Sequence, residues 1–272
     1  MPSWSTIEKI LARLEADDIM PQYQPMLIGE AVDWSALPVE VDPTGGLMDG
    51  LRAQRKRWQV ENVIRVLEDL VQPGDVIVDF GASSGNLGLP VAACFPDCHV
   101  YIVDKKPHTV EIAKMRMAGS GLSNVELYPG FVQEVTVPFE IGLGLHLCGD
   151  GTDQAQTLCM ERGVSYVMAP CCIGFIQRSP LSYPRSAAFR KILDRQEYNW
   201  LASVADWTCR DETSEQHQRG KRCMGFVNTD RNLVAEEQGY RTALYTMDPS
   251  DASPKNEIIA GRKKEPDDAV SD

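Results

Sequence analysis

The chain has 272 residues, 43% of them apolar, and a formal net charge of −12 at pH 7. This length suits one α/β domain with extensions, and no apolar run reaches the roughly 18 residues of a membrane span. The acidic balance argues against tight, non-specific binding to nucleic acid, which depends on basic surfaces. The N-terminus lacks the basic segment and apolar run of a secretory signal, so we expect a cytoplasmic protein.

An N-terminal helical extension is predicted over residues 1–46. Residues 5–17 carry apolar side chains at helical spacing, which indicates a short amphipathic helix. Residues 21–46 are rich in proline, glycine and aspartate and predict an extended wrap or lid. A second helix is expected over 47–71, because Pro73-Gly74 ends its apolar pattern.

Strand and helix patterns then alternate, which predicts an α/β domain with a parallel, doubly wound, Rossmann-like sheet. The first five strands are expected at residues 76–80, 99–103, 125–128, 141–147 and 165–169. The crossover helices between and after them are expected at 86–94, 108–119 and 152–162. Beyond the fifth strand we expect helices at 186–194 and 197–206, a polar loop at 208–221, a sixth strand at 222–228, a helix at 230–238 and a seventh strand at 240–247. The domain would cover 47–261, followed by a disordered tail at 262–272.

The most informative segment is Val76-Ile-Val-Asp-Phe-Gly-Ala-Ser-Ser-Gly-Asn-Leu-Gly88, a strand that ends in an acid and enters a glycine-rich turn. Such a turn brings the backbone close to a nucleotide-like ligand. Short-chain dehydrogenases use a similar turn for NAD(P), and class I methyltransferases use one for S-adenosylmethionine. In the dehydrogenase pattern the last glycine would come one position before Gly88. The required Tyr-x-x-x-Lys pair matches only Tyr101 and Lys105, which lie in or beside a predicted strand, so the dehydrogenase interpretation is disfavoured.

S-adenosylmethionine explains more of these residues. Asp79 would orient the amino-acid end of the cofactor, and glycines in the turn would give the backbone clearance. Asp104 ends the second strand, where an acid accepts hydrogen bonds from ribose hydroxyls. Phe131 follows the third strand, where it would border adenine. The cofactor-binding residues that we expect are Asp79, Gly81, Ala82, Gly85, Asp104, Lys105, Gly130, Phe131 and His146.

A second unusual segment, beginning His146-Leu147-Cys148-Gly149, ends the fourth strand, which faces the reactive methyl in class I methyltransferases. His146 would bind the acceptor or act as a base, because imidazole titrates near neutral pH; a structural role is the alternative. Cys171 and Cys172 at the end of the adjacent strand favour the site. We therefore predict His146, Cys171 and Cys172 as catalytic residues. No Cys-x-x-Cys pair is present, so we expect no metal.

Taken together these segments resemble the methyltransferase domain of glutathione S-transferase C-terminal domain-containing proteins. More distantly, they are similar to tRNA ribose 2′-O-methyltransferases. The resemblance rests on His146-Leu-Cys-Gly-x-x-Thr-Asp153 and Ala169-Pro-Cys-Cys172, and on further segments at 52–62, 183–186, 205–207, 221–224 and 253–256. It implies a class I fold and S-adenosylmethionine as cofactor. Relatives usually have Gly-Lys where this chain has Ser83-Ser84, and Ser83 fits the turn only if its backbone is not left-handed.

The acceptor stays open. Arg52, Arg55, Lys56 and Gln59 share one helix face and are predicted to bind substrate, either a cofactor carboxylate or an anion such as RNA phosphate. A solvated basic face is the plain alternative. We expect a methyltransferase whose acceptor is RNA, a protein or a small molecule, or else a non-catalytic module that binds S-adenosylmethionine.

Overall fold

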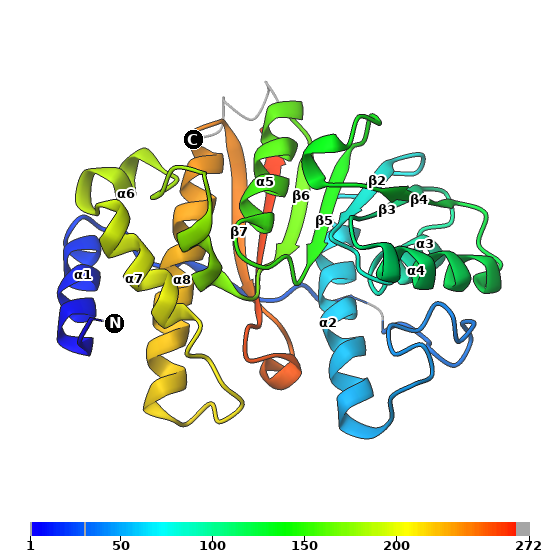
Figure 1. Ribbon diagram of the computed structural model, residues 1–272, viewed down its shortest axis with the longest axis horizontal. Coiled ribbons are helices and arrows are strands. Elements are labelled where there is room, and N and C mark those ends of the chain that lie inside the picture. The colour runs from blue at the N-terminus through cyan, green and yellow to red at the C-terminus, as the bar shows by residue number, and fades with distance from the viewer. Residues whose placement is uncertain (1, 30, 265–272) are drawn as a thin grey trace.

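The computed structural model describes residues 2–29 and 31–264, and one sheet runs through their centre (Figure 1). Its strand order is β1-β7-β8-β6-β5-β2-β3-β4. Every neighbouring pair is parallel except those of β8, which lies antiparallel between β6 and β7. The bounds are β1 Tyr23–Gln24, β2 Val76–Phe80, β3 His99–Asp104, β4 Val125–Pro129, β5 Ile141–Leu145, β6 Ser165–Ala169, β7 Tyr240–Thr246 and β8 Glu257–Lys263. Apart from the two-residue edge strand β1, the sheet has seven strands and is mostly parallel, as the predicted doubly wound α/β fold requires.

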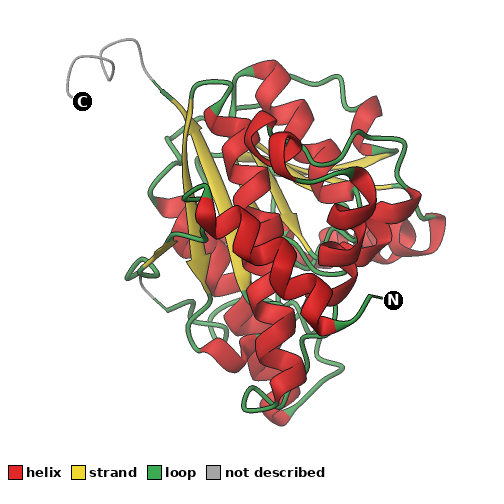
Figure 2. Cartoon of the chain, turned by 90° about the vertical axis from the view of Figure 1, so that its left-hand side faces the viewer, coloured by secondary structure: helices red, strands yellow, loops and turns green. Residues whose placement is uncertain are grey.

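Helices cover both faces of the sheet because each strand buries apolar side chains on both sides. One face is covered by α2 (Gly50–Glu68), α3 (Gly88–Cys94) and α4 (Pro107–Ser120), and the other by α5 (Gly151–Arg162) and α8 (Glu215–Glu236). Three further helices, α1 (Trp4–Ala16), α6 (Ala187–Ile192) and α7 (Arg195–Ala205), pack on α8 and form an extra layer (Figure 2). None of the helices in this part of the chain is long and apolar enough to cross a membrane.

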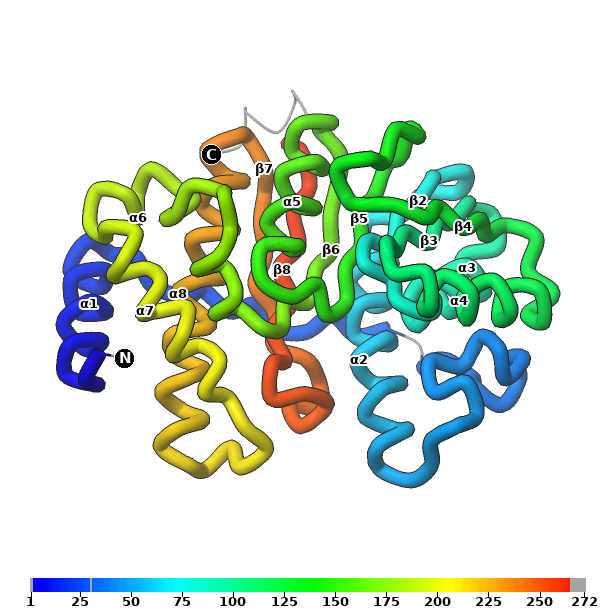
Figure 3. Tube along the Cα trace, in the orientation of Figure 1, coloured from blue at the N-terminus to red at the C-terminus, as the bar shows by residue number. Residues whose placement is uncertain are grey.

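The segment between α1 and α2 is the predicted wrap, and it runs from the α1 side of the molecule to α2 (Figure 3). Trp34 Nε1 donates to Glu61 Oε1 on α2 at 2.6 Å. Arg57 on α2 pairs with Asp42 at 2.5 Å. The wrap is therefore fixed along the helices beside the glycine turn.

The predicted sixth strand at 222–228 is wrong, because these residues lie inside the 22-residue helix α8. The helix also takes the second half of the predicted loop at 208–221 and most of the predicted helix at 230–238. Residues 223–228 are all buried, since α8 packs against α7 on one side and the sheet on the other. A short, continuous apolar run does not distinguish a buried helix from a strand.

The strand that the sequence analysis missed is β8. Its residues up to 261 were assigned to no helix or strand, and those from 262 onward were assigned to the disordered tail. Its last residues, Arg262 and Lys263, pair with β7, so the predicted disordered tail does not begin at 262. The rest of that prediction, from residue 265 onward, lies outside the described residues.

A buried ionic network joins α5 to α8. Asp153, at the start of α5, accepts hydrogen bonds from Arg231 Nε at 2.9 Å and Nη2 at 3.0 Å. The hydroxyl of Tyr183 donates to the same carboxylate at 2.7 Å, and Arg185 lies 3.3 Å from it. The Asp153 carboxylate therefore links α5 to α8 on the face of the sheet that both helices cover.

Candidate functional site

Two adjoining cavities open at the carboxyl ends of β2, β3 and β5, with volumes of about 290 and 350 Å³. Both are lined by Gly81, Asp104, Lys106 and His146. The first continues to Lys56, Gln59, Asp79, Ala82, Ser83 and Asn86. The second continues to Lys105, Gly130, Phe131, Gln133, Cys148 and Gln154. The fold thus gathers most of the predicted site residues, which come from five separate segments of the chain, around one concave region.

Asp79 lies at the floor of the first cavity and is fully buried. Its Oδ2 accepts the backbone N–H of Gly88 at 2.8 Å, while its Oδ1 has no partner among the described residues. Burial, with a smaller contribution from the nearby Asp104, raises the pKa of Asp79 to about 8. A buried oxygen without a donor is costly, and an ammonium group in the cavity would satisfy it. The site therefore fits the amino-acid end of S-adenosylmethionine.

The glycine turn adopts the left-handed backbone that such turns need. The φ angles are 63° at Gly81 and 79° at Gly85. At Gly81 a Cβ atom would also lie 2.4 Å from Leu147 Cδ2, so a larger residue would have to displace the Leu147 side chain. From the sequence we expected Ser83 to fit the turn only if its backbone were not left-handed. Its φ of 54° is left-handed, so this expectation is wrong. The Ser83 N–H donates to Asp104 Oδ2 at 2.9 Å, and this bond helps to hold the strained residue.

Replacing Ser83 with glycine should raise the free energy of unfolding by about 0.5 kcal/mol. A left-handed non-glycine residue costs about 1–2 kcal/mol, and the extra freedom of glycine in the unfolded chain offsets roughly half of this. Ser84 has no positive φ, so Ser84→Gly is the matched control and should lower stability by about 0.5–1 kcal/mol. Urea denaturation of both variants measures the difference, and an equal loss in both would contradict the strain at Ser83.

Asp104 shapes the junction of the two cavities. Its Oδ1 accepts from the Lys106 N–H and from Thr109 Oγ1, both at 2.8 Å, and its Oδ2 accepts from Ser83. A carboxylate oxygen accepts two hydrogen bonds, so Oδ2 keeps a lone pair for a ribose hydroxyl. In the second cavity Phe131 is half exposed, and Lys105 Nζ lies 4.7 Å from its ring centre. This ring offers a flat apolar surface for a base.

His146 is held by a residue predicted to bind substrate. Gln59 Nε2 donates to the Ala252 carbonyl at 2.8 Å, which turns Gln59 Oε1 toward His146 Nε2 at 2.5 Å. His146 therefore donates its Nε2–H, and its Nδ1 is left as an acceptor in the neutral ring. Burial of the imidazole within the cavity lowers the pKa of His146, and the positive charge of Lys56 lowers it further. Part of the His146 surface is nevertheless exposed. Its φ of 64° makes it the second strained non-glycine residue at the site.

The predicted basic face divides into residues with different environments. Arg55 pairs with Asp251 at 2.9 Å and so supports the β7–β8 loop. Lys56 donates to the Pro43 carbonyl at 2.9 Å and lines the first cavity. Arg52 is exposed, with no hydrogen bond or ion pair to any described residue. Only Lys56 and Arg52 remain candidates for contact with an anionic ligand.

The cysteines that follow β5 and β6 meet at the mouth of the second cavity. The sulfur atoms of Cys148, Cys171 and Cys172 all lie within 4.8 Å of one another, and those of Cys148 and Cys171 are 3.1 Å apart. Cys148 is exposed and lines the cavity, whereas Cys171 is buried. Cys171 and Cys172 were predicted from the sequence as catalytic residues. Metal ligands were sought only at short spacing, which cannot reveal ligands that come from two strands.

Arg116 on α4 supports the site and was not predicted. It donates to the carbonyls of Glu40 and Asp42 in the wrap, both at 2.9 Å. It also donates to the Ser84 carbonyl at 2.7 Å and to Asn86 Oδ1 at 2.8 Å in the glycine turn. Nothing in its helical sequence distinguishes it from a solvated arginine.

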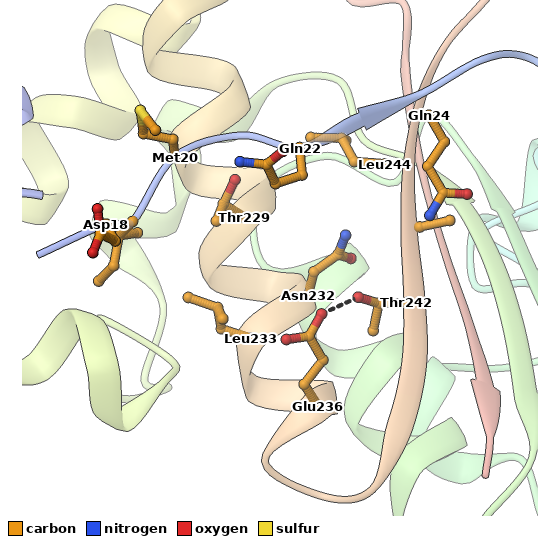
Figure 4. A pocket seen from close by; sticks show the side chains of 12 residues that line it. Asp18, Met20, Gln22, Gln24, Thr229, Asn232, Leu233, Glu236, Thr242 and Leu244 are labelled. Atoms are coloured by element: carbon orange, nitrogen blue, oxygen red, sulfur yellow. Dashed lines mark hydrogen bonds between the residues drawn. The ribbon is translucent and has the colours of Figure 1, made fainter. Parts of the chain in front are cut away.

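A further cavity lies away from this region, between α8, β7 and the chain that follows α1 (Figure 4). Glu236 accepts a hydrogen bond from Thr242 inside it. None of the predicted site residues lines this cavity. The region of the two cavities at the glycine turn is therefore the candidate site.

Comparisons with known proteins cover the segment that forms most of this site. Residues 55–179 match a family model described as "Methyltransferase domain". The chain is 37% identical over 232 residues to a glutathione S-transferase C-terminal domain-containing protein of Xenopus laevis, covering 85% of this chain and 38% of that protein. The human protein is 38% identical over 231 residues, covering 85% and 36%. The Drosophila melanogaster homolog is 36% identical over 244 residues, covering 86% and 40%. The chain thus spans well under half the length of these curated relatives. Residues 55–179 thus carry a methyltransferase domain.

Proposed function

We propose that this chain transfers the methyl group of S-adenosylmethionine to an RNA acceptor that enters beside His146 and Cys148. The observation that carries the proposal is the buried Oδ1 of Asp79, which has no hydrogen-bond partner in the described part of the chain and lines a cavity that continues to His146. An orphaned acid at this depth calls for a cationic ligand group, and the ammonium of the cofactor supplies one.

The cofactor provides an electrophilic methyl on a sulfonium, and the residues of the chain position it. Asp79 would hold the ammonium group, and Lys56, at the same cavity, would face the carboxylate. Asp104 would accept the ribose hydroxyls. Phe131 would cover one face of adenine. Displacement at a methyl group needs alignment above all, so this fixed set of contacts would account for much of the rate.

His146 would act on the acceptor. Its Nε2–H is committed to Gln59, so Nδ1 is the atom that would take a proton from an acceptor hydroxyl as the new bond to the methyl carbon forms. The lowered pKa keeps the ring neutral and able to accept a proton at pH 7.

The charge around the cavities supports an RNA acceptor. Lys56, Lys105 and Lys106 line them, in a chain with a net charge of −12. Exposed Arg52 lies on the same helix as Lys56. A local group of cations at the site mouth would contact phosphates, while the acidic remainder would limit non-specific binding.

The rate at saturating cofactor should fall as the pH decreases below the pKa of His146, which lies under 6.5, and stay flat above it. His146→Gln should lower the rate by about 10²–10⁴-fold and abolish this acid limb, because glutamine has no basic nitrogen. Rates measured between pH 5 and about pH 8 test this. An acid limb that persists in His146→Gln would show that another group is the base.

The acceptor itself is tested by incubating the protein with S-adenosylmethionine labelled on the methyl group and separate RNA, protein and small-molecule fractions. Label in RNA, lost with Arg52→Glu/Lys105→Glu and retained with the remote control Arg262→Glu, is the expected result. Label only in protein or only in small molecules would overturn the RNA assignment. Absence of label, together with intact cofactor binding, would indicate a non-catalytic module.

A further inference from the structure

Three thiols meet where two parallel strands end. β5 and β6 pair in register up to Leu145 and Ala169, so the residues that follow each strand are neighbours. The loops are fixed to each other, because the His146 N–H donates to the Ala169 carbonyl at 3.1 Å and the Gly149 N–H to the Cys172 carbonyl at 2.8 Å. The backbones that carry Cys148, Cys171 and Cys172 are thus held beside each other.

The spacing of the sulfur atoms suits a metal ion. Thiolates bind zinc at about 2.3 Å, and tetrahedral geometry separates such sulfurs by roughly 3.8 Å. The three Sγ atoms lie within 4.8 Å of one another, and those of Cys148 and Cys171 are 3.1 Å apart, so the sulfurs are gathered on the scale that a zinc ion requires. Binding would need side-chain rotations that move the Cys148 and Cys171 sulfurs slightly apart.

We propose that Cys148, Cys171 and Cys172 bind a Zn²⁺ ion as three thiolate ligands, with a fourth position open toward the cavity that Cys148 lines. Among the described residues no other histidine, cysteine or carboxylate joins this group. Three protein ligands with one open position characterise catalytic rather than structural zinc.

The electrostatics of the cluster agree with this geometry. Hydrogen bonding from Cys171, opposed by burial and helped by Cys172, lowers the pKa of Cys148. The same contact with Cys148 raises the pKa of Cys171, and burial raises that of Cys172. These two thiols would release their protons as the ion binds. Lys255 and Asp206, which pair with each other, face the cluster and largely offset one another's charge.

Because it would face the acceptor side of the pocket, the ion would take an acceptor oxygen, nitrogen or sulfur in its fourth position and polarise it next to His146. This consequence rests on the proposed methyl transfer, whereas metal binding itself does not. The short contact between the Cys148 and Cys171 sulfurs would also allow a disulfide bond, which is the alternative to metal binding.

Titration of the reduced chain with Co²⁺ tests the site, because cobalt replaces zinc and its thiolate charge-transfer and ligand-field absorption report sulfur ligands in a tetrahedral field. One equivalent should saturate these bands, and Zn²⁺ should displace the cobalt. Cys148→Ser and Cys172→Ser should each weaken binding at least about tenfold. Cys94→Ser, which removes a thiol outside the cluster, should leave cobalt binding unchanged.

Circular dichroism confirms that the variants fold, and calorimetry with S-adenosylmethionine follows cofactor binding in the same samples. Thiolate bands that are absent from the folded wild type, or that survive in both serine variants, would overturn the metal site. A Cys148–Cys171 disulfide that re-forms in place of metal binding would do the same. If the wild type does not bind S-adenosylmethionine, the proposed function is contradicted instead. Failure of the metal site and failure of the proposed function can therefore be told apart.

Discussion

Arg231→Ala should lower the free energy of unfolding by about 3–5 kcal/mol, a large part of the stability of a domain this size. Arg231 is 1% exposed and Asp153 is fully buried, and they form two hydrogen bonds at 2.9 and 3.0 Å. Removing the arginine leaves a buried carboxylate whose remaining cation, Arg185, is 3.3 Å away. The cost arises mainly from this uncompensated charge, not from the loss of attraction between the pair.

Urea denaturation measures the effect, and Arg222→Ala on the same helix is the matched control. Arg222 pairs with Glu15 at 2.6 Å, but both side chains are partly exposed, so this change should cost less than about 1 kcal/mol. The double variant Arg231→Met/Asp153→Leu should recover much of the loss, because it removes both buried charges together. Equal effects of Arg231→Ala and Arg222→Ala would contradict the buried network.

Asp104→Ala should weaken binding of S-adenosylmethionine by about 10- to 100-fold. Hydrogen bonds to a charged acceptor contribute roughly 1.5–3 kcal/mol each, and the ribose would lose at least one. The change also releases the N–H groups of Ser83 and Lys106, which the carboxylate now fixes. The glycine turn would then lose part of its preformed shape.

Calorimetric titration compares this variant with Asp97→Ala, which removes an exposed acid that lies before β3 and outside the cavities. Asp104→Asn should fall between the two, because an amide oxygen still accepts one backbone bond. Wild-type affinity in Asp104→Ala would show that the cofactor does not use this acid.

The parts of the fold that were predicted correctly have strong local signals. The strand and turn from Val76 to Gly88 combine a buried apolar run, an acid and glycines that adopt φ values of 63° and 79° where the turn requires them. Residues 222–228 of α8 were wrongly predicted as a strand because residues 223–228 are all buried. Their apolar side chains therefore show little helical periodicity in the sequence. Two of its glycines let other segments approach closely: Gly220 lies against the Thr208 backbone and Gly225 against Tyr23.

The sequence allowed us to name candidate site residues, but not to predict which of them contact one another. His146 and Gln59 are 87 positions apart, and only the packed sheet and α2 bring them to 2.5 Å. The same holds for Arg116, which joins the wrap to the glycine turn, and for Cys148 beside Cys171. Several segments of the family resemblance also have structural partners: Lys221 donates to Asn256 at 2.6 Å, and Asp206 accepts from the Ile173 N–H at 2.9 Å. Sequence spacing alone carries no information on such distant pairs.

The most direct test of the central claim is calorimetric titration of S-adenosylmethionine at pH 7 in buffers with different ionisation enthalpies. Because the pKa of Asp79 is about 8, this acid is mostly protonated in the free protein, and an ammonium group at Oδ1 would drive the proton off. We predict one cofactor bound per chain, with a proton release to the buffer that Asp79→Asn lowers. No binding at millimolar cofactor, or the same proton release in Asp79→Asn, would contradict the assignment of the cofactor to this cavity.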